Sequence, residues 1–262
     1  MKADVNGISI NYSTKGEAGD WVVLSHSLSG SLEAWAPQIE ELSATFRVLV
    51  YDIRGHGQSD APQGPYTMDL LADDLEALLD HLKIDRAHLV GLSLGGAIAQ
   101  TLAVRRPGRL LSLTIADATS AYPPSTHAMW EGRINQVETQ GIQSIVGGTL
   151  DRWFTPAFRA HDPQTVDAVG NIIRATSPTG FIGAVGAIMG FDISSKLFGV
   201  QIPTLVLVGE EDKALPVEHS RFIADSIPGA RLEIIPAAAH ISNLEQPTDF
   251  SRRLINFLEC IR

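Results

Sequence analysis

Cysteine is almost absent from this 262-residue chain, which contains only Cys260. One cysteine excludes an internal disulfide framework, and no motif around Cys260 indicates a catalytic thiol. Charged residues are also scarce, at 19%, whereas 44% of the residues are apolar. A chain with this balance can bury a sizeable core, so disorder is not expected. The composition therefore predicts one globular domain, with room for an insertion.

Positive charge is in deficit as well, since the formal net charge is -10. This balance argues against nucleic acid as a partner, because nucleic-acid binding needs a basic face. The first residues lack the apolar core of a signal peptide. The most apolar stretch, residues 180–191, is too short to span a bilayer. We therefore expect a cytoplasmic protein with no membrane partner; its oligomeric state stays open.

Short β-branched runs alternate along the chain with amphipathic helical segments. This alternation predicts a mostly parallel sheet with helices on both faces. The expected strands are an opening hairpin of residues 5–12 and 21–26, then residues 47–51, 87–91, 111–116, 204–208 and 231–235. The expected helices are residues 32–44, 68–82 with Thr67 as N-cap, 93–106, 217–226 and 247–261.

Between residues 119 and 199 the alternation stops. The segment is rich in tryptophan and phenylalanine, and its pattern indicates helices without clear strands. We interpret residues 119–199 as a helical cap inserted into a core formed by residues 1–118 and 200–262. No internal repeat is visible.

The strongest local motif is Gly91-Leu92-Ser93-Leu94-Gly95. It has the G-x-S-x-G pattern, with an apolar strand before it and a helix after it. This context predicts a sharp strand-to-helix turn that exposes the Ser93 hydroxyl as a nucleophile. Serine at this position also excludes the usual dehalogenase and epoxide hydrolase chemistry, which needs an aspartate there.

A serine hydroxyl needs an adjacent base, and the base needs an orienting acid. In this arrangement the chain order is serine, acid, histidine. His240 follows the last expected strand and is the predicted base, whereas His219 lies in an expected helix and is taken as exposed. The acid should follow the strand before it. We assign Asp212 there, with Glu210 and Glu211 as ordinary loop charges and Asp117 as the outside alternative.

Acyl transfer also needs two donors for the developing oxyanion. We expect the backbone N–H of Leu94, directly after the nucleophile, and that of Leu28, in the loop after the strand of residues 21–26. His26 is interpreted as structural, and Ser27 as a residue that contacts substrate. The loop of residues 52–59 is also interpreted as structural. No metal-binding spacing, P-loop or dinucleotide fingerprint is present.

The motifs taken together resemble 3-oxoadipate enol-lactone hydrolases, over nearly the whole chain and including the cap. The matching segments are Arg54-Gly55-His56-Gly57 with Ser59-Asp60, Gly64-Pro65-Tyr66-Thr67, Asp74 to Leu82, the serine motif, Arg152-Trp153-Phe154-Thr155-Pro156 and Ala239-His240-Ile241-Ser242-Asn243 with Glu245-Gln246-Pro247. One segment departs from the pattern: His26-Ser27-Leu28-Ser29 stands where the family usually has Asn-Ser-Leu-Gly.

The resemblance implies an α/β-hydrolase fold, with an eight-stranded, mostly parallel sheet and an inserted helical cap. It implies hydrolysis of an enol-lactone to 3-oxoadipate, with no metal or organic cofactor. The predicted mechanism is attack by Ser93, an acyl-enzyme and its hydrolysis. The alternatives are a general carboxylesterase or another lactonase, then a carbon–carbon bond hydrolase, then a small-molecule receptor.

An enol-lactone of this kind carries a carboxylate, so the charge of the cap matters. The cap has five basic and six acidic residues, which leaves most of the negative charge on the core. Arg133 is our candidate for binding the carboxylate, because a guanidinium can hold one with two hydrogen bonds; the alternative is an exposed helix charge. Trp130 and Trp153 either line the pocket or only pack the cap.

Overall fold

Eight strands form a single sheet in the computed structural model, which describes residues 1–261. Their order across the sheet is β1-β2-β4-β3-β5-β6-β7-β8. Among the strands of the described residues, only β1–β2 and β2–β4 are antiparallel pairs. The predicted eight-stranded, mostly parallel sheet is therefore confirmed. The strands are β1 (Lys2–Val5), β2 (Ile8–Lys15), β3 (Trp21–Ser25), β4 (Arg47–Tyr51), β5 (Ala87–Leu92), β6 (Leu110–Ala116), β7 (Thr204–Gly209) and β8 (Arg231–Ile235).

The opening hairpin differs from the prediction, which paired residues 5–12 with residues 21–26. The hairpin instead joins β1 to β2 through Asn6 and Gly7, whose φ angles are 47° and 77°. Positive φ at both central residues is typical of the tight turns that link antiparallel strands. β3 lies between β4 and β5 and runs parallel to both.

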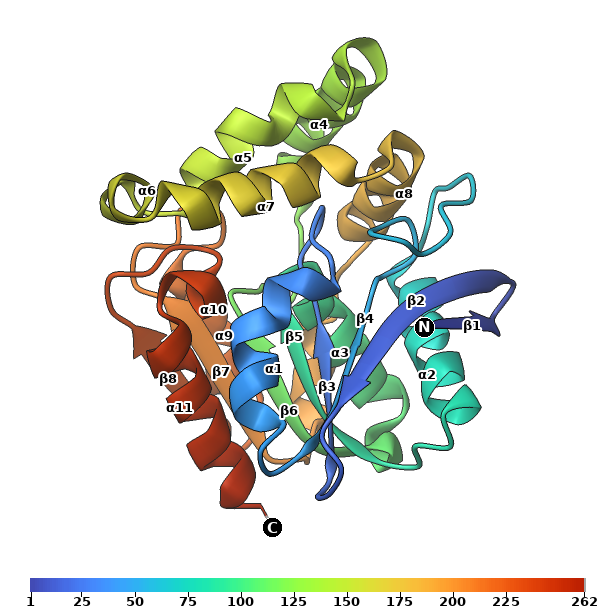
Figure 1. Ribbon diagram of the computed structural model, residues 1–262, viewed down its shortest axis with the longest axis vertical. Helices are drawn as coiled ribbons and strands as arrows, with labels where there is room; N and C mark the ends of the chain where they lie inside the picture. The colour runs from blue at the N-terminus through green and yellow to red at the C-terminus, as the bar shows by residue number, and fades with distance from the viewer. Residues whose placement is uncertain (262) are drawn as a thin grey trace.

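Helices cover both faces of the sheet, as the alternation predicted (Figure 1). On one face lie α1 (Ala36–Leu42) and α11 (Pro247–Glu259); on the other lie α2 (Met68–His81), α3 (Leu94–Arg105) and α9 (Val217–Ser226). Successive side chains along a strand pack into two different hydrophobic cores, one on each face of the sheet. In β3, Val22 and Leu24 pack with the α1 and α11 side, whereas Val23 packs with the α2 and α3 side. The sheet is thus buried on both faces.

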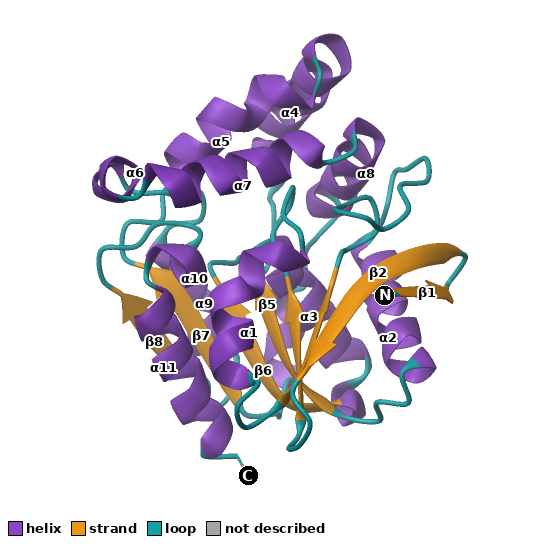
Figure 2. Cartoon of the chain, in the orientation of Figure 1, coloured by secondary structure: helices purple, strands orange, loops and turns teal. Residues whose placement is uncertain are grey.

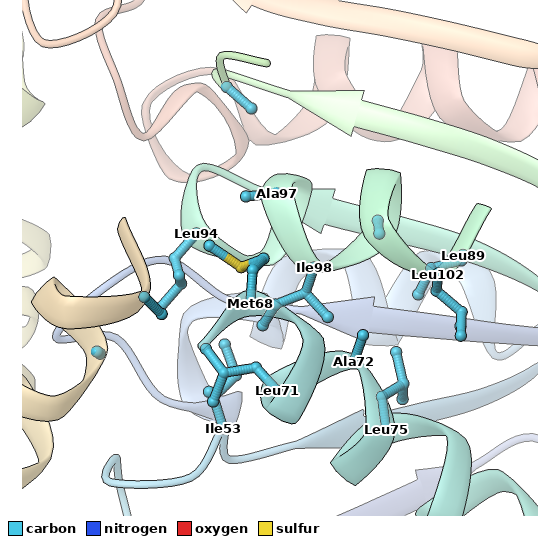
Figure 3. Packing of buried hydrophobic residues seen from close by; sticks show 14 of the residues in the cluster. Ile53, Met68, Leu71, Ala72, Leu75, Leu89, Leu94, Ala97, Ile98 and Leu102 are labelled. Carbon is cyan, nitrogen blue, oxygen red and sulfur yellow. The ribbon is translucent and has the colours of Figure 1, made fainter. Parts of the chain in front are cut away.

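α2 and α3 pack against each other over the sheet, as the close-up in Figure 3 shows. Leu71, Ala72 and Leu75 of α2 meet Ile98 and Leu102 of α3, and all five are buried. Thr67 caps α2 as predicted, since its hydroxyl accepts a hydrogen bond from the N–H of Leu70 at 3.1 Å. This packing fixes α3, and the first residue of α3 follows Ser93.

Five α-helices lie between β6 and β7 and cover the carboxyl ends of the parallel strands (Figures 1 and 2). We call them the cap helices: α4 (His127–Gln140), α5 (Val146–Trp153), α6 (Pro156–His161), α7 (Pro163–Ala175) and α8 (Pro178–Met189). In the described part of residues 119–199, the only β contact is an isolated bridge between Ala121 and Asp192. The exact cap boundaries remain a prediction.

The loop after β4 supports the cap from below. Arg54 and Asp74 form a buried ion pair with two hydrogen bonds of 2.6 Å, which anchors this loop to α2. Gly55 then meets Gly180 of α8 so closely that a Cβ on Gly180 would lie 1.9 Å from the Gly55 carbonyl oxygen. These contacts are in keeping with the structural interpretation of the loop.

Within residues 1–261, no single helix has the length and apolar character needed to cross a membrane. Only α7 and α8 taken together reach that length and composition, and they are bent by 94°.

Candidate active site

Ser93 occupies the turn between β5 and α3, where its φ is 54°. Non-glycine residues rarely adopt this conformation. The glycines on either side have no room for a side chain. A Cβ on Gly91 would lie 2.1 Å from the Gly95 carbonyl oxygen, and a Cβ on Gly95 would lie 2.1 Å from that of Ser25. This tight turn presents the Ser93 side chain at the wall of a cavity.

Three loop residues form one hydrogen-bonded chain at the carboxyl edge of the sheet. His240, in the loop after β8, has its Nε2 2.9 Å from the Ser93 Oγ and its Nδ1 2.8 Å from Oδ2 of Asp212. Asp212, after β7, is fixed in turn, because its Oδ1 accepts the N–H groups of Ala214 and Leu215 at 2.8 and 2.9 Å. The structure therefore brings together the three residues that the sequence assigned to nucleophile, base and acid.

The surroundings of His240 favour its protonated form. Burial alone would lower the pKa of this imidazole, but the Asp212 carboxylate attracts and hydrogen-bonds the charged ring. The charge of Asp117 acts in the same direction, and the net result is a pKa above the ordinary value. An imidazole that takes the proton of Ser93 is thus stabilised as a cation, which is the requirement for activating a serine hydroxyl.

A second buried carboxylate, Asp117, lies at the end of β6. Its Oδ1 accepts the N–H of Gly209 at 2.8 Å, and its Oδ2 accepts the hydroxyl of Ser242 at 2.5 Å. Burial and the nearby charge of Asp212 raise the pKa of Asp117 to about 7. Asp117 thus joins the loops that carry Asp212 and His240. It makes no hydrogen bond to the imidazole, so the geometry favours Asp212 as the orienting acid.

The amides of Leu28 and Leu94 are the oxyanion donors that the sequence predicted, and both are close in the fold to the cavity that Ser93 lines. Leu94 is the first residue of α3, where helical N–H groups have no partner within the helix. Leu28 lines the same cavity as Ser93. Within residues 1–261, neither amide donates a hydrogen bond to a protein acceptor outside regular secondary structure. Two free N–H groups beside a nucleophile can stabilise the oxyanion of acyl transfer.

The loop around Leu28 carries the predicted contact residue Ser27 and its neighbour Ser29. Ser27 does not line the cavity, whereas Ser29 does, and the buried hydroxyl of Ser29 has no partner in the described part of the chain. His26 makes two hydrogen bonds to the backbone, which is in keeping with the structural interpretation: its Nδ1–H donates to the Ser27 carbonyl at 2.7 Å, and its Nε2 accepts the N–H of Ile53 at 3.0 Å. Ser29 is therefore the better candidate for contact with a ligand.

The cavity has a volume of about 320 Å³ and lies between the sheet edge and the cap helices. Trp130 and Trp153 both contribute to its wall. The Trp153 ring lies 6.1 Å from the His240 ring, and the Trp130 ring packs edge-on against Tyr122 at 5.9 Å. The buried indole N–H of Trp130 has no partner among residues 1–261. An apolar wall with a few free donors is typical of a small-molecule site.

The charged residues of the cavity wall are all basic. Arg133, Arg152 and Lys213 line it, and no described aspartate or glutamate does. None of these three cations forms an ion pair within the described residues. In a chain with a net charge of -10, such a wall favours an anionic ligand. Residues 1–261 contain no group of three histidine, cysteine, aspartate or glutamate side chains placed to hold a metal ion.

Arg133 is the most desolvated of these cations. Its Nη2 donates to the Thr149 hydroxyl at 3.0 Å, and its guanidinium lies 5.1 Å from the Trp130 ring and 5.8 Å from the Phe181 ring. Burial, together with the nearby charge of Arg152, lowers the pKa of Arg133 to about 10. A partly buried cation without a counter-ion gains most from a carboxylate ligand.

Sequence reasoning missed three ionisable residues of the wall, Arg152, Lys213 and His219. It did not single out Arg152 and Lys213 as cavity residues, although each directly precedes or follows a predicted site residue, Trp153 or Asp212. It took His219 as exposed, but this residue is partly buried and lines the cavity, with its Nδ1 3.0 Å from the Thr119 hydroxyl. The helical pattern of α9 places His219 on a helix but does not show that this face meets a cavity.

Comparison with known proteins agrees with the fold. The sequence model of the alpha/beta hydrolase fold matches residues 20–247. The chain is 36% identical over 245 residues to 3-oxoadipate enol-lactonase 2 of Acinetobacter baylyi. This alignment covers 93% of this chain and 91% of that protein. It is 31% identical to RutD, a proposed carbamate hydrolase of a Caulobacter species, over 90% of both chains.

Among solved structures, the enol-lactonase of Burkholderia xenovorans superimposes with a TM-score of 0.95. The two chains are 35% identical, and the superposition covers 99% of this chain and 100% of the other.

Proposed function

We propose, since the chain belongs to the alpha/beta hydrolase fold family, that it hydrolyses a lactone or ester that carries a carboxylate. The specific substrate that we propose is 3-oxoadipate enol-lactone. One observation carries the proposal: the hydrogen-bonded chain of Ser93, His240 and Asp212 opens into a cavity whose charged wall residues are all basic. The relatives named as enol-lactonases support the choice of lactone.

In the first half of the proposed reaction, the Ser93 Oγ attacks the lactone carbonyl carbon while His240 Nε2 takes the hydroxyl proton. Asp212 holds the imidazole and stabilises its positive charge. The N–H groups of Leu28 and Leu94 bind the oxyanion of the tetrahedral intermediate. The intermediate then collapses and breaks the ring carbon–oxygen bond. The enol oxygen leaves with a proton from His240, and the enol tautomerises to a ketone.

In the second half, water attacks the acyl-enzyme and gives its proton to His240 Nε2. The new tetrahedral intermediate collapses, the Ser93 oxygen leaves, and His240 returns the proton to it. The product is the open-chain keto acid with two carboxylates.

The free carboxylate of the lactone fits the basic wall. Arg133 can donate two hydrogen bonds to it, and this carboxylate would supply a counter-ion to a desolvated cation that forms no ion pair among residues 1–261. Arg152 and Lys213 add to the positive potential. The aromatic wall of Trp130 and Trp153 then contacts the ring.

A carbamate is the second candidate substrate, because relatives that include the Caulobacter protein bear the name of proposed carbamate hydrolases. The same nucleophile, base and oxyanion donors can act on a carbamate carbonyl. The two substrates differ in the leaving group, which is an enol oxygen in one case and a nitrogen or alcohol in the other.

Steady-state hydrolysis tests the proposal. Wild-type protein and Ser93→Ala are assayed with 3-oxoadipate enol-lactone, p-nitrophenyl acetate and a small carbamate. We expect kcat/KM to be largest for the lactone and to fall in Ser93→Ala on the order of 10⁴-fold or more. Full activity in Ser93→Ala would reject the serine mechanism. Better turnover of the simple ester or the carbamate would keep the mechanism and replace the substrate.

A further inference from the structure

A buried glutamate joins the loop of His240 to the cap. Glu245 ends the short helix α10 (Ser242–Glu245) and is only 3% exposed. Its Oε1 accepts hydrogen bonds from the N–H of Thr155, at 2.9 Å, and from the Thr155 hydroxyl. Its Oε2 accepts the N–H of Ala239 at 2.8 Å. One carboxylate thus binds the residue before His240 and the turn between α5 and α6.

The residue after His240 is also bound to the cap. The N–H of Ile241 donates to the Trp153 carbonyl at 3.2 Å, and the Trp153 ring faces the His240 ring at 6.1 Å. We call residues 236–241 the histidine loop and residues 153–155 the cap turn. Hydrogen bonds on both sides of His240 therefore lead to the cap turn, which also contributes Trp153 to the cavity wall.

Two further hydrogen bonds hold the histidine loop to the core: the Ala238 carbonyl accepts the N–H of Glu211 at 2.8 Å, and the Ala237 carbonyl accepts the Gln246 side chain at 3.0 Å. Three of its residues are alanines, Ala237 to Ala239, whose side chains offer few rotamers and small contacts. A buried carboxylate without a cation is costly, and here it forms no ion pair within residues 1–261. Its three donors offset that cost. Removing the acceptor would leave two backbone N–H groups unpaired, one on each side of the junction.

We propose that Glu245 is a positioning residue that sets the orientation of His240 toward Ser93 and Asp212. The same contacts hold the Trp153 wall at a fixed place relative to the proposed base. The inference rests on the proposed function, since it assigns to His240 the role of base. It concerns the rate of the chemical step more than binding, because the Arg133 end of the cavity does not touch Glu245.

The first variant is Glu245→Gln, which keeps the size of the side chain but turns one acceptor into an N–H₂ donor. That donor must face either the Thr155 donors or the Ala239 N–H. We expect kcat for p-nitrophenyl acetate and for the lactone to fall about ten- to hundredfold, as for a small misplacement of a catalytic group. KM for the lactone should change by less than about twofold.

The pH profile gives a readout that a purely structural role would not move. A displaced His240 loses part of its contact with Asp212, and burial then lowers its pKa. The acid limb of kcat/KM should therefore shift to lower pH in Glu245→Gln. Thr155→Val removes the hydroxyl that donates to Glu245 from the cap turn. It should lower kcat and shift the acid limb to lower pH, in both cases by less than Glu245→Gln does. Thr155→Ser keeps the hydroxyl and should restore wild-type behaviour.

Gln246→Ala is the matched control. The Gln246 side chain donates to the Ala237 carbonyl at 3.0 Å, so it also contacts the histidine loop but does not reach the cap turn. We expect its kcat to stay within about twofold of wild type. Thermal unfolding and circular dichroism accompany every variant; if Glu245→Gln does not fold, Thr155→Val against Thr155→Ser decides the question.

The inference is overturned if folded Glu245→Gln and Thr155→Val keep the wild-type kcat and acid limb. It is also overturned if kcat falls while the acid limb of the pH profile stays in place, or if Gln246→Ala loses as much kcat as Glu245→Gln. Failure of the proposed function is seen separately, as activity that survives Ser93→Ala. The use of p-nitrophenyl acetate keeps the test valid even if the lactone is not the substrate.

Discussion

Arg133 places a positive charge in a cavity wall that has no described carboxylate. If it binds the substrate carboxylate, Arg133→Gln should raise KM for the enol-lactone about ten- to hundredfold, because a charged hydrogen-bonded pair contributes about 1.5–3 kcal/mol. KM for the neutral p-nitrophenyl acetate should not change. Arg152→Gln should have a smaller effect, since Arg152 is exposed and solvent screens it. Steady-state kinetics with both substrates measures this.

The control for Arg133 is Arg174→Gln. Arg174 lies on α7, donates to Asn171 at 2.9 Å and does not line the cavity. Its removal should leave both KM values unchanged. An equal rise of KM for the lactone and the neutral ester in Arg133→Gln would show that Arg133 supports the cavity wall and does not bind the carboxylate.

At the scale of single residues, chemistry could be predicted better than recognition. Ser93, Asp212 and His240 follow strand ends in a fixed order, so topology alone predicts that they meet. Ser29 and Arg152 could not be assigned in this way. Whether Ser27 or Ser29 faces the cavity depends on the turn after β3, where Ser29 has a φ of 57°, and spacing along the chain does not reveal that conformation.

The tight turn between β5 and α3 depends on glycine for space. Gly91→Ala would place a Cβ 2.1 Å from the Gly95 carbonyl oxygen, a backbone atom that cannot move without α3. We expect a loss of about 1–3 kcal/mol in the free energy of unfolding, as for other overpacked sites. Activity should fall with it, because α3 carries the Leu94 amide. Urea unfolding and p-nitrophenyl acetate turnover check both.

Gly147→Ala on α5 is the matched control for this turn. Nothing lies within 4 Å of the added Cβ, and the position is helical and exposed. Alanine there should be neutral or add about 0.5 kcal/mol, because glycine loses more backbone freedom on folding. If Gly91→Ala is equally harmless, the steric account of the motif is wrong.

At the scale of elements, regular periodicity could be predicted and contacts between elements could not. The bounds of β4 and the N-cap residue of α2 match the predictions. A strand buried on both faces has a short apolar run, and an N-cap has a preferred residue type, so both can be recognised locally in the sequence. The hairpin was mispaired because its turn, Asn6-Gly7, lay inside the first expected strand. Helices α6 and α7 begin with proline after Thr155 and Asp162, a readable start signal, yet their packing over the sheet depends on distant contacts such as Glu245.

Across the whole molecule, positive and negative charges are unevenly distributed. The chain has a net charge of -10, yet the charged residues of the cavity wall are basic, so most negative charge faces away from the proposed site. Burial also matters at this scale, because buried histidines that stay neutral in the folded protein make its stability depend on pH. The most prominent are His26 and His56, whose buried rings lie 5.3 Å apart.

Both of these histidines should destabilise the fold at acid pH. Burial, and then the neighbouring His26, lower the pKa of His56 from 6.5 to about 3; burial also lowers that of His26. Below pH 6.5 the unfolded chain therefore binds protons that the folded chain does not, so stability falls as pH falls from 6.5 toward 3. His56 alone should account for about 2 kcal/mol between pH 6.5 and 5.

Other groups titrate in the same range, so a variant must isolate this contribution. His240 and Asp117 have raised pKa values, and protonation of these two groups favours the folded state as pH falls. His56→Asn removes one titrating ring and leaves those groups in place. It should be less stable than wild type at pH 7, because the His56 Nδ1 bond to the Arg54 carbonyl at 3.1 Å is altered. By pH 5 the difference should shrink by about 2 kcal/mol. Urea unfolding at both pH values measures it, and parallel pH dependences in the two proteins would show that His56 is not kept neutral by the fold.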